Sequence, residues 1–488
     1  MKRTFFTSLI IYFSLGCTAQ SRVLTLNLSE TIEQAKTHSI KSLVATNSYI
    51  ASYWAYRQYK ASLLPSLSIG ITPFQYNQNL TRRYDSQQNI DVYKSQQNLY
   101  SYLSISASQA FPFTGGTFIL DSDLNFLKNF GKNGYSQFST APLRIGYSQK
   151  IFGHNSYKWS KKIEPKKFEK AKKELLYEIE DAACMATSYF YDLALQQKKL
   201  ELCKDNVARC DTANKIAKER LLIGVGTRAQ IHTLRLNLLN AQKALREAVN
   251  QVKQAQQRIS SFLHQDKTVS IHVLPQKPQE AILIDPNEAI SLAKDANPTI
   301  LQMEIDILNN KQQIDQVKKN RYSSSLSASI GLSQYAESFT KAFNSPLHQE
   351  SVVLSFNLPI LDWGINKGRI IIAKQNLNAA ILRNEQAIDD FEQKVIFTIN
   401  QFHESYVQIG LSEEAEEAAK IAYYDTYQQF LLGKSDVDAL GISQSRLNEA
   451  SRDYINALAN YWSLYYQIRK MTLYDFKKRT PIDINTNH

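Results

Sequence analysis

The sequence predicts a mainly α-helical fold with a smaller set of amphipathic strands, in which one structural plan is used twice. Gly and Pro supply 16 and 12 of the 488 residues, which is about half of their usual share. A chain with so few helix breakers consists mostly of long regular elements. The other two observations are an internal repeat and a seven-residue spacing of apolar side chains along the helices.

Composition and charge exclude several classes of protein. The mean hydropathy of −0.36 excludes a protein built of many membrane-spanning helices. The formal net charge is +12, but Lys and Arg are dispersed among Glu and Asp, which is typical of a solvated helical surface. Beyond the N-terminal segment, Cys184, Cys203 and Cys210 form no disulfide framework, so we expect buried thiols.

The N-terminus has the pattern of a secretory signal peptide, which we assign to residues 1–19. Two basic residues follow Met1, and an apolar run and then small residues come next, which is the order of an export signal. The run is too short to span a membrane as a helix. Two processing routes remain open, namely cleavage after Ala19 and acylation of Cys17 at the end of an imperfect lipoprotein box.

The chain repeats one plan of helix, strands, long helix, tight turn and helix. The turn at 222–224 recurs at 431–433, 209 residues later, and the same shift aligns the apolar positions that follow. The segment 29–35 likewise resembles 287–293. The predicted boundaries are 1–19 for the signal peptide, 20–270 for the first repeat, 271–285 for a linker, 286–476 for the second repeat and 477–488 for a tail.

Apolar residues follow a heptad spacing after each tight turn. Their steps alternate between three and four residues, which is typical of helices packed side by side in a coiled coil. Three of the ten residues in the first set are Ala, so the helices can approach closely. The first set is Ile231, Leu234, Leu238, Ala241, Leu245, Ala248, Val252, Ala255, Ile259 and Phe262, and the second is Leu447, Ala450, Tyr454, Ala457, Tyr461, Leu464, Ile468 and Met471.

The predicted helices are long, and two short helices match one long helix in each repeat. At 1.5 Å per residue, 160–222 and 364–432 span about 95 and 100 Å. A globular core cannot enclose such helices, whereas a rod or tube can. The short helices of about 50 Å are 29–62, 228–262, 286–320 and 435–474, the last less its frayed end.

Six segments between the helices alternate polar and apolar residues, which indicates strands with one wet and one apolar face. This alternation is typical of membrane β-barrels, although a soluble amphipathic sheet has the same pattern. So few strands cannot close a barrel around a useful pore, and lipid does not tolerate open edges. Strands that enter a membrane would therefore require several chains to share one barrel. The segments are 66–71, 102–107, 117–122, 143–147, 326–331 and 352–357.

Together these features resemble the TolC family of outer-membrane efflux ducts over nearly the whole mature chain. The resemblance rests on the duplicated plan, the helical pattern leading to Asn297-Pro298, the Leu-Pro-Ile-Leu-Asp-Trp-Gly motif at 358–364 and the two turn motifs. The aromatic-rich segment 460–476 looks like the branch of the family found in Bacteroidetes.

The resemblance implies a homotrimer in the outer membrane with a long periplasmic extension. Each chain would lend about four strands to a shared transmembrane β-barrel, and coiled-coil helix hairpins would form a periplasmic α-barrel. The first repeat has more strand candidates than the two that the family usually shows. Segments 75–100 and 125–137 are not placed by the resemblance.

The two tight turns are the predicted functional sites, because in this family they contact the adaptor protein of an inner-membrane pump and close the tunnel. Many members narrow at acidic rings just beyond the tip Gly, where this chain has Ala439 with two Asp residues nearby. Three copies would make each Asp a ring that favours cations. The adaptor-contact candidates are Leu222, Gly224, Val225, Gly226, Thr227, Leu432, Gly433, Lys434 and Ser435, and the gate candidates are Asp436, Asp438, Arg228 and His232.

Nothing in the sequence suggests catalysis. The eight His residues are scattered, and the chain has neither a Gly-rich phosphate loop nor a nucleophile elbow. Clusters of acidic residues on the predicted helices are typical of solvated faces. We therefore expect no enzyme activity, no cofactor and no metal.

The sequence thus predicts a passive trimeric exit duct of a tripartite efflux or type I secretion system. Its partners would be its own copies, a periplasmic adaptor, an inner-membrane pump and outer-membrane lipid, without nucleic acid. One alternative is a periplasmic coiled-coil structural or adaptor protein without a channel, which leaves the strands unexplained. The other is an exported basic adhesin or nucleic-acid binder, which the dispersed Lys residues disfavour. Neither the cargo nor the pump class is encoded recognisably.

Overall fold

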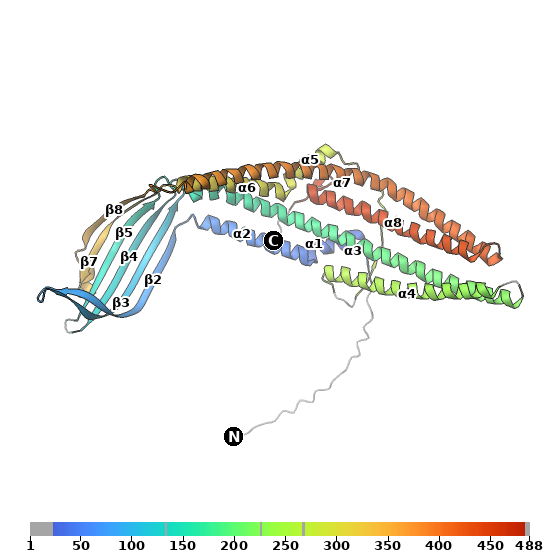
Figure 1. The fold of residues 1–488 in the computed structure, drawn as a ribbon, viewed down its shortest axis with the longest axis horizontal. Helices are drawn as coiled ribbons and strands as arrows, with labels where there is room; N and C mark the ends of the chain where they lie inside the picture. The colour runs from blue at the N-terminus through green and yellow to red at the C-terminus, as the bar shows by residue number, and fades with distance from the viewer. Residues whose placement is uncertain (1–22, 132–133, 225–226, 266–268, 484–488) are drawn as a thin grey trace, which may run out of the picture. The chain divides into compact units, whose positions relative to one another are not determined.

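The computed structural model describes residues 23–131, 134–224, 227–265 and 269–483. Its elements fall into two compact units, each of which draws on both sequence repeats (Figure 1). The sheet unit comprises Asn47–Leu175 and Asn297–Gln393. The hairpin unit comprises Leu176–Ala296 together with the chain before Asn47 and after Gln393.

The sheet unit contains one antiparallel six-stranded sheet in the order β2-β3-β4-β5-β7-β8. All six predicted segments lie in these strands, and the unplaced segments 75–100 and 125–137 lengthen four of them. The expectation of about four strands does not hold for this chain, because β3 and β4 form an additional hairpin. The bounds are Ser66–Asp85 for β2, Ile90–Phe111 for β3, Gly116–Phe130 for β4, Tyr135–Gln149 for β5, Ser323–Ala336 for β7 and Leu347–Asn357 for β8.

The pairing register gives the sheet one polar and one apolar face, because directly paired residues point to the same side. Ser66 and Ser68 bond to Ser108 and Ser106 across the first pair of strands, with hydroxyl oxygens 2.8 Å apart. Arg144 continues the polar face on β5 and forms ion pairs with Asp121 and Asp123 of β4. The apolar face carries Leu67, Ile69 and Ile71, Leu103 and Ile105, Leu120, Ile145, Ile330, Val352 and Leu354.

Four helical segments are tied together within the sheet unit. They belong to α2 (Ile40–Ala61), α3 (Ser156–Leu222), α6 (Pro298–Lys319) and α7 (Ile365–Leu432). Tyr56 of α2 stacks on Phe168 of α3 with ring centroids 4.9 Å apart. The indole N–H of Trp159 donates to Asp315 at 3.1 Å and so joins α3 to α6. No helix in the described part of the chain is both long and apolar enough to cross a membrane.

Two helices predicted as continuous are each broken into two. The expected helix 29–62 is α1 (Leu28–His38) followed by α2, and 286–320 is α5 (Pro286–Ala296) followed by α6. The second break has a clear cause, because Pro298 disfavours helical backbone at the preceding Asn297, whose side chain caps α6 through the N–H of Thr299. Ser39 takes the same extended conformation after α1 without a following proline.

The hairpin unit buries most of the predicted heptad positions. On α4 (Arg228–Phe262), Leu234, Ala241, Ala248, Val252, Ala255 and Ile259 are buried. On α8 (Val437–Thr472), buried Tyr461 lies with its ring 4.8 Å from that of Phe402 on α7. The sequence patterns missed a parallel pair of short strands in this unit, β1 (Val23–Leu26) and β6 (Ser270–Val273).

A buried cluster of charges joins the first and last helices of the hairpin unit to α3. The Glu180 side chain on α3 is 0% exposed. Lys36 of α1 lies 2.5 Å from its Oε1 and Arg469 of α8 lies 2.9 Å from its Oε2. Arg469 also contacts Asp475 at 2.7 Å. Because every charge has an opposite partner, the cluster compensates for part of the cost of burial.

Asp475 belongs to a short C-terminal strap that folds back on α8. It lies in the two-residue strand β9 (Tyr474–Asp475), which pairs with β10 (Thr480–Pro481). Burial alone would raise the pKa of Asp475, but the Tyr465 hydroxyl, the N–H groups of Lys477 and Lys478 and the charge of Arg469 hold it below its ordinary value. Asp475 therefore stays ionised and available to Arg469.

We expect Glu180→Gln to destabilise the protein by about 3–5 kcal/mol, because it leaves Lys36 and Arg469 without their shared buried carboxylate. The control Glu178→Gln removes a half-exposed carboxylate that pairs with Lys41 at 3.2 Å, and it should cost about 1 kcal/mol or less. Urea unfolding followed by circular dichroism measures both losses. Equal losses for the two variants would contradict a special role for the buried cluster.

Candidate functional site

The first predicted tip joins α3 to α4 through a tight reversal. Gly224 has φ of +82°, and its N–H bonds to the carbonyl of Leu221 at 3.1 Å, as in a glycine-terminated helix. Thr227 then caps α4 in a reciprocal capping box with Gln230. The candidates Val225 and Gly226 lie outside the described residues.

The second tip joins α7 to α8 and has a complete helix-ending motif. The N–H of Gly433, whose φ is +77°, bonds to the carbonyl of Phe430 at 3.0 Å, and the N–H of Lys434 bonds to that of Gln429 at 2.9 Å. These two bonds are those of a Schellman motif, which favours Gly at the left-handed position. The repeated Gly is thus explained at both tips by the same backbone requirement.

A single arginine connects the two tips. The guanidinium of Arg220, in the last turn of α3, donates to the carbonyl of Leu431 at 2.6 Å and to that of Phe430 at 3.4 Å. It thereby satisfies carbonyls at the C-terminal end of α7, where a helix favours positive charge. Beneath it, Ala213, Leu234 and Phe430 form a small buried core.

The sequence patterns did not identify Arg220. A basic residue in the last turn of a helix is expected to favour its own helix end, so the pattern carries no sign of a contact with the other hairpin. Only the proximity of the two tips in the folded chain reveals that role.

The ends of α3 and α7 expose large apolar side chains at the tips. Leu222 and Leu432, the last residues of α3 and α7, are 79% and 70% exposed, and Ile223 just after α3 is 74% exposed. Gly224, Thr227, Gly433 and Lys434 are also exposed, and Ser435 is half-buried. An exposed leucine therefore lies at the same position of each tip, Leu222 at the end of α3 and Leu432 at the end of α7.

The four gate candidates lie at the starts of α4 and α8. Arg228 and His232 are exposed on the first turns of α4. Asp436 is the N-cap of α8, and its carboxylate accepts the N–H of Ala439 at 2.7 Å. Asp438 is exposed in the first turn of the same helix. Asp436 therefore caps the start of α8, and a role of these four residues in gating stays a prediction.

Further along α3 from the first tip, an arginine contacts two neighbouring tyrosine rings. The guanidinium carbon of Arg209 on α3 is 5.0 and 5.1 Å from the ring centres of Tyr423 and Tyr427 on α7. Burial raises the pKa of Tyr423 to about 12 despite the opposing charge of Arg209. Arg209 and Tyr423 also line a cavity of about 350 Å³ between α3, α4, α7 and α8.

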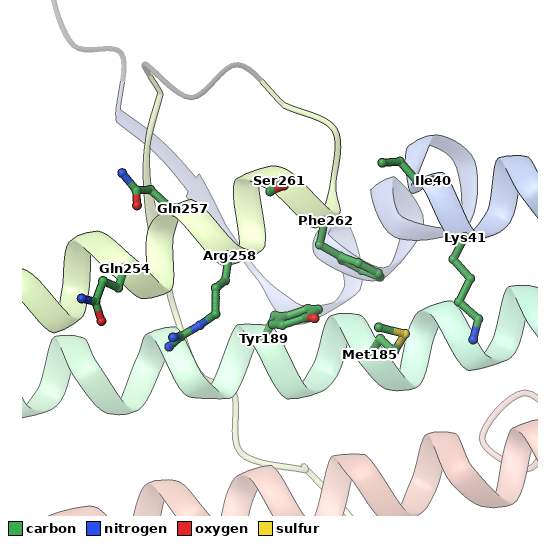
Figure 2. Close-up of a pocket in the computed structure, with 9 residues that line it drawn as sticks. All are labelled: Ile40, Lys41, Met185, Tyr189, Gln254, Gln257, Arg258, Ser261 and Phe262. Carbon is green, nitrogen blue, oxygen red and sulfur yellow. The ribbon is translucent and has the colours of Figure 1, made fainter.

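A larger hollow of about 910 Å³ lies at the other end of α4. Figure 2 shows it between the end of α4, the start of α2 and α3, with Tyr189 and Phe262 at its centre. Its two charged groups are already paired, Lys41 with Asp181 and Arg258 with Asp192. No group of three metal-ligating side chains occurs among the described residues. The hollow therefore offers no acid–base pair for chemistry.

Aromatic side chains gather at both ends of the sheet. Near the helices, Phe118 of β4 lies 4.6 Å from Tyr147 of β5, as measured between ring centroids. At the far end, Phe126 lies 4.8 Å from Phe138, which contacts Phe339 in the loop after β7. Phe118 and Phe126 are separated along β4 by about 26 Å at ~3.3 Å per residue. At the ~40° strand tilt of an outer-membrane barrel, this separation is a height of about 20 Å, which fits within the ~25 Å apolar band that aromatic girdles flank.

Residues 289–472 match the family model of the outer membrane efflux protein. This match, together with the fold, confirms the resemblance to TolC-like channels, and the Bacteroidetes branch stays a prediction. No curated protein matches the chain.

Solved outer-membrane proteins share the fold across almost the whole chain. The CmeC outer membrane channel of Campylobacter jejuni aligns with a TM-score of 0.66 at 13% identity, over 91% of this chain and 85% of that one. VceC of Vibrio cholerae gives 0.60 at 15%, over 91% and 95%. The open-state MtrE channel of Neisseria gonorrhoeae gives 0.58 at 14%, over 94% and 91%. The matched proteins are channels and outer-membrane proteins rather than enzymes.

We expect Gly433→Ala to destabilise the second tip by about 1–2 kcal/mol, because a Cβ disfavours the left-handed conformation. A Cβ there would also lie 3.4 Å from the Arg220 guanidinium. The control Gly441→Ala adds a Cβ inside α8, where nothing lies within 4 Å, and it should stabilise the helix by up to about 1 kcal/mol. Hydrogen exchange of the tip amides measures the difference. Equal protection in both variants would contradict the prediction.

Proposed function

We propose that this chain, whose residues 289–472 match the outer membrane efflux protein model and whose fold is that of TolC-like channels, is a passive exit duct in the outer membrane. Three copies would share one β-barrel, and the helices would extend into the periplasm. The duct would receive cargo from an inner-membrane pump through a periplasmic adaptor, in a tripartite efflux or type I secretion system. The N-terminal segment, with Cys17, lies outside the described residues, so export and acylation stay predictions.

The two-faced sheet carries this proposal. Its apolar face exposes Leu67, Ile69 and Ile71 at 62–74%, a surface that water does not favour. Its opposite face is rich in Ser and carries the Arg144 ion pairs, as expected for a wet lumen. At a ~40° strand tilt, the aromatic groups at the two ends lie about 20 Å apart in height, within the ~25 Å apolar band of an outer-membrane barrel. A periplasmic coiled-coil spacer without a channel gives this sheet no purpose.

The helix tips support the docking part of the proposal. Exposed Leu222, Ile223 and Leu432 offer an apolar surface of the kind that helical partners cover. Thr227, Lys434 and Ser435 add polar groups at its margin. We assign the adaptor contact to this surface and the closed end of the duct to the residues that follow it, Arg228, His232, Asp436 and Asp438.

Detergent extraction from membranes and planar-bilayer recording test the duct itself. We expect a particle of three chains with a small conductance. Arg220→Met removes the hydrogen bonds between the tips but keeps the aliphatic bulk of the side chain. The tips should then be held together less firmly, so we expect a higher conductance. Arg235→Met, at an exposed position of α4, is the control and should leave it unchanged. A water-soluble single chain without conductance would refute the proposal and favour the coiled-coil spacer.

The acidic residues at the second tip predict ion selectivity. The double substitution Asp436→Asn with Asp438→Asn should lower the preference for cations several-fold, because a threefold ring of carboxylates favours cations. Asn is also a good N-cap, so α8 should keep its start. Reversal potentials in a salt gradient give the selectivity.

Glu449→Gln with Asp453→Asn serves as the matched control, because it removes two exposed carboxylates further along α8. Selectivity that changes equally in both double variants, or in neither, would remove the ring from the proposal.

A further inference from the structure

The β3–β4 hairpin is built into the wall of the sheet. β3 pairs with the whole length of β2, from Ser66 to Asp85 of β2. It also pairs with β4 along fifteen of its own residues, from Gln97 to Phe111. The hairpin is also anchored where it meets the helices. Gln109 donates to the carbonyl of Leu63 at 2.6 Å, and Asn155, just before α3, donates to that of Pro112 at 2.8 Å. Because β3 and β4 each pair with a neighbouring strand on both sides, the hairpin is an integral part of the sheet.

This hairpin gives the sheet more strands than the helices beneath it require. β2 follows α2, β5 precedes α3, β7 follows α6 and β8 precedes α7, so four strands continue into four helices. β3 and β4 continue into none, because residues 112–115 join them directly. The helical part of the duct therefore repeats four segments per chain, whereas the sheet repeats six.

The two outer strand edges are suited to pairing with another copy of the chain. In the described part of the sheet, β2 and β8 are the outer strands, each bonded on one side. An open edge in lipid leaves unpaired N–H and C=O groups, which lipid does not tolerate. β2 runs away from the helices and β8 runs back toward them, so β8 of one copy can pair antiparallel with β2 of the next. The even strand number keeps this pattern around a closed ring.

We infer that the β3–β4 hairpin widens the barrel, so that three copies close a ring of eighteen strands through the edges of β2 and β8. This inference rests on the proposed three-chain duct. With strands ~4.8 Å apart and tilted by ~40°, such a ring is roughly 36 Å across at the backbone, against roughly 24 Å for twelve strands. After about 5 Å of side chain on each wall, the lumens are roughly 26 and 14 Å wide.

The wider lumen has a functional consequence. The barrel would admit solutes of about 20 Å, so the sheet would not select cargo by size. Selection by size would fall to the narrow end at the helix tips. The solute class is therefore any bulky cargo that the pump delivers, such as a polypeptide or a large amphiphile.

Single-particle imaging of the detergent-extracted particle counts the strands directly. We expect eighteen, six from each chain. Polymer exclusion in planar bilayers gives a second measure, because poly(ethylene glycol) of about 20 Å should enter the wide barrel and lower the conductance when it is added on the barrel side.

A deletion variant tests the cause of the width. Replacing residues 79–133 by Asn-Gly removes β3 and β4 and lets β2 pair with β5, which should exclude the same polymer. The matched control replaces only residues 80–95 by Asn-Gly, because there β2 pairs with β3 alone and no third strand is attached. This control should admit the polymer as the unaltered chain does.

The outcomes separate this inference from the function on which it rests. A conducting particle of three chains with twelve strands in its wall, or one that excludes the polymer, would overturn the wide barrel and leave the duct intact. A ring of two chains with twelve strands would overturn both the copy number and the width. The absence of any conducting particle would refute the duct itself. If the deletion variant fails to assemble, the strand count of the unaltered particle still decides.

Discussion

The structure depends on the constraint that the two-faced sheet imposes. Its apolar face must be kept from water, its polar face must be wet, and the outer edges of β2 and β8 must find hydrogen-bond partners. A single chain meets none of these three requirements. A ring of chains in a lipid bilayer meets all of them together, which is why membrane location, assembly and a water-filled interior form one proposal rather than three.

The helices bury their apolar side chains by packing closely side by side. Small residues such as Ala241 and Ala248 let α4 approach its neighbours closely, so long helices bury a seam without a globular core. Their ends are then free to be specialised. At the tips, Gly224 and Gly433 reverse the chain, and Arg220 joins the two hairpins through main-chain carbonyls. Because that contact uses backbone atoms of α7, the side chains on the outer surface of the tip remain available for a partner.

Local patterns predicted much of the fold, because helices and strands have strong periodicities of their own. The alternation of polar and apolar residues located every strand of the main sheet, and the heptads located the buried side of α4 and α8. The break at Ser39 was missed because nothing around it distinguishes it from a residue within a helix. The break at Asn297 was missed although the following Pro298 marks it in the sequence. The β1–β6 pair and the Arg220 contact were missed because each joins segments far apart in the sequence. The tip candidates were located by their repeated glycines, but those glycines report backbone geometry and do not reveal which side chains a partner would touch.

The buried charges around Glu180 bear on how the chain is completed. Lys36 and Glu180 come early in the sequence, whereas Arg469 and Asp475 come close to its end. Until the last helix is made, Glu180 has Lys36 as its partner, but its second oxygen, Oε2, lacks the Arg469 guanidinium. Docking of the early helices before that point would bury this oxygen without its cationic partner, which costs free energy. A chain that stops before residue 469 lacks both Arg469 and Asp475, so the charge cluster that joins the last helix to α3 cannot form.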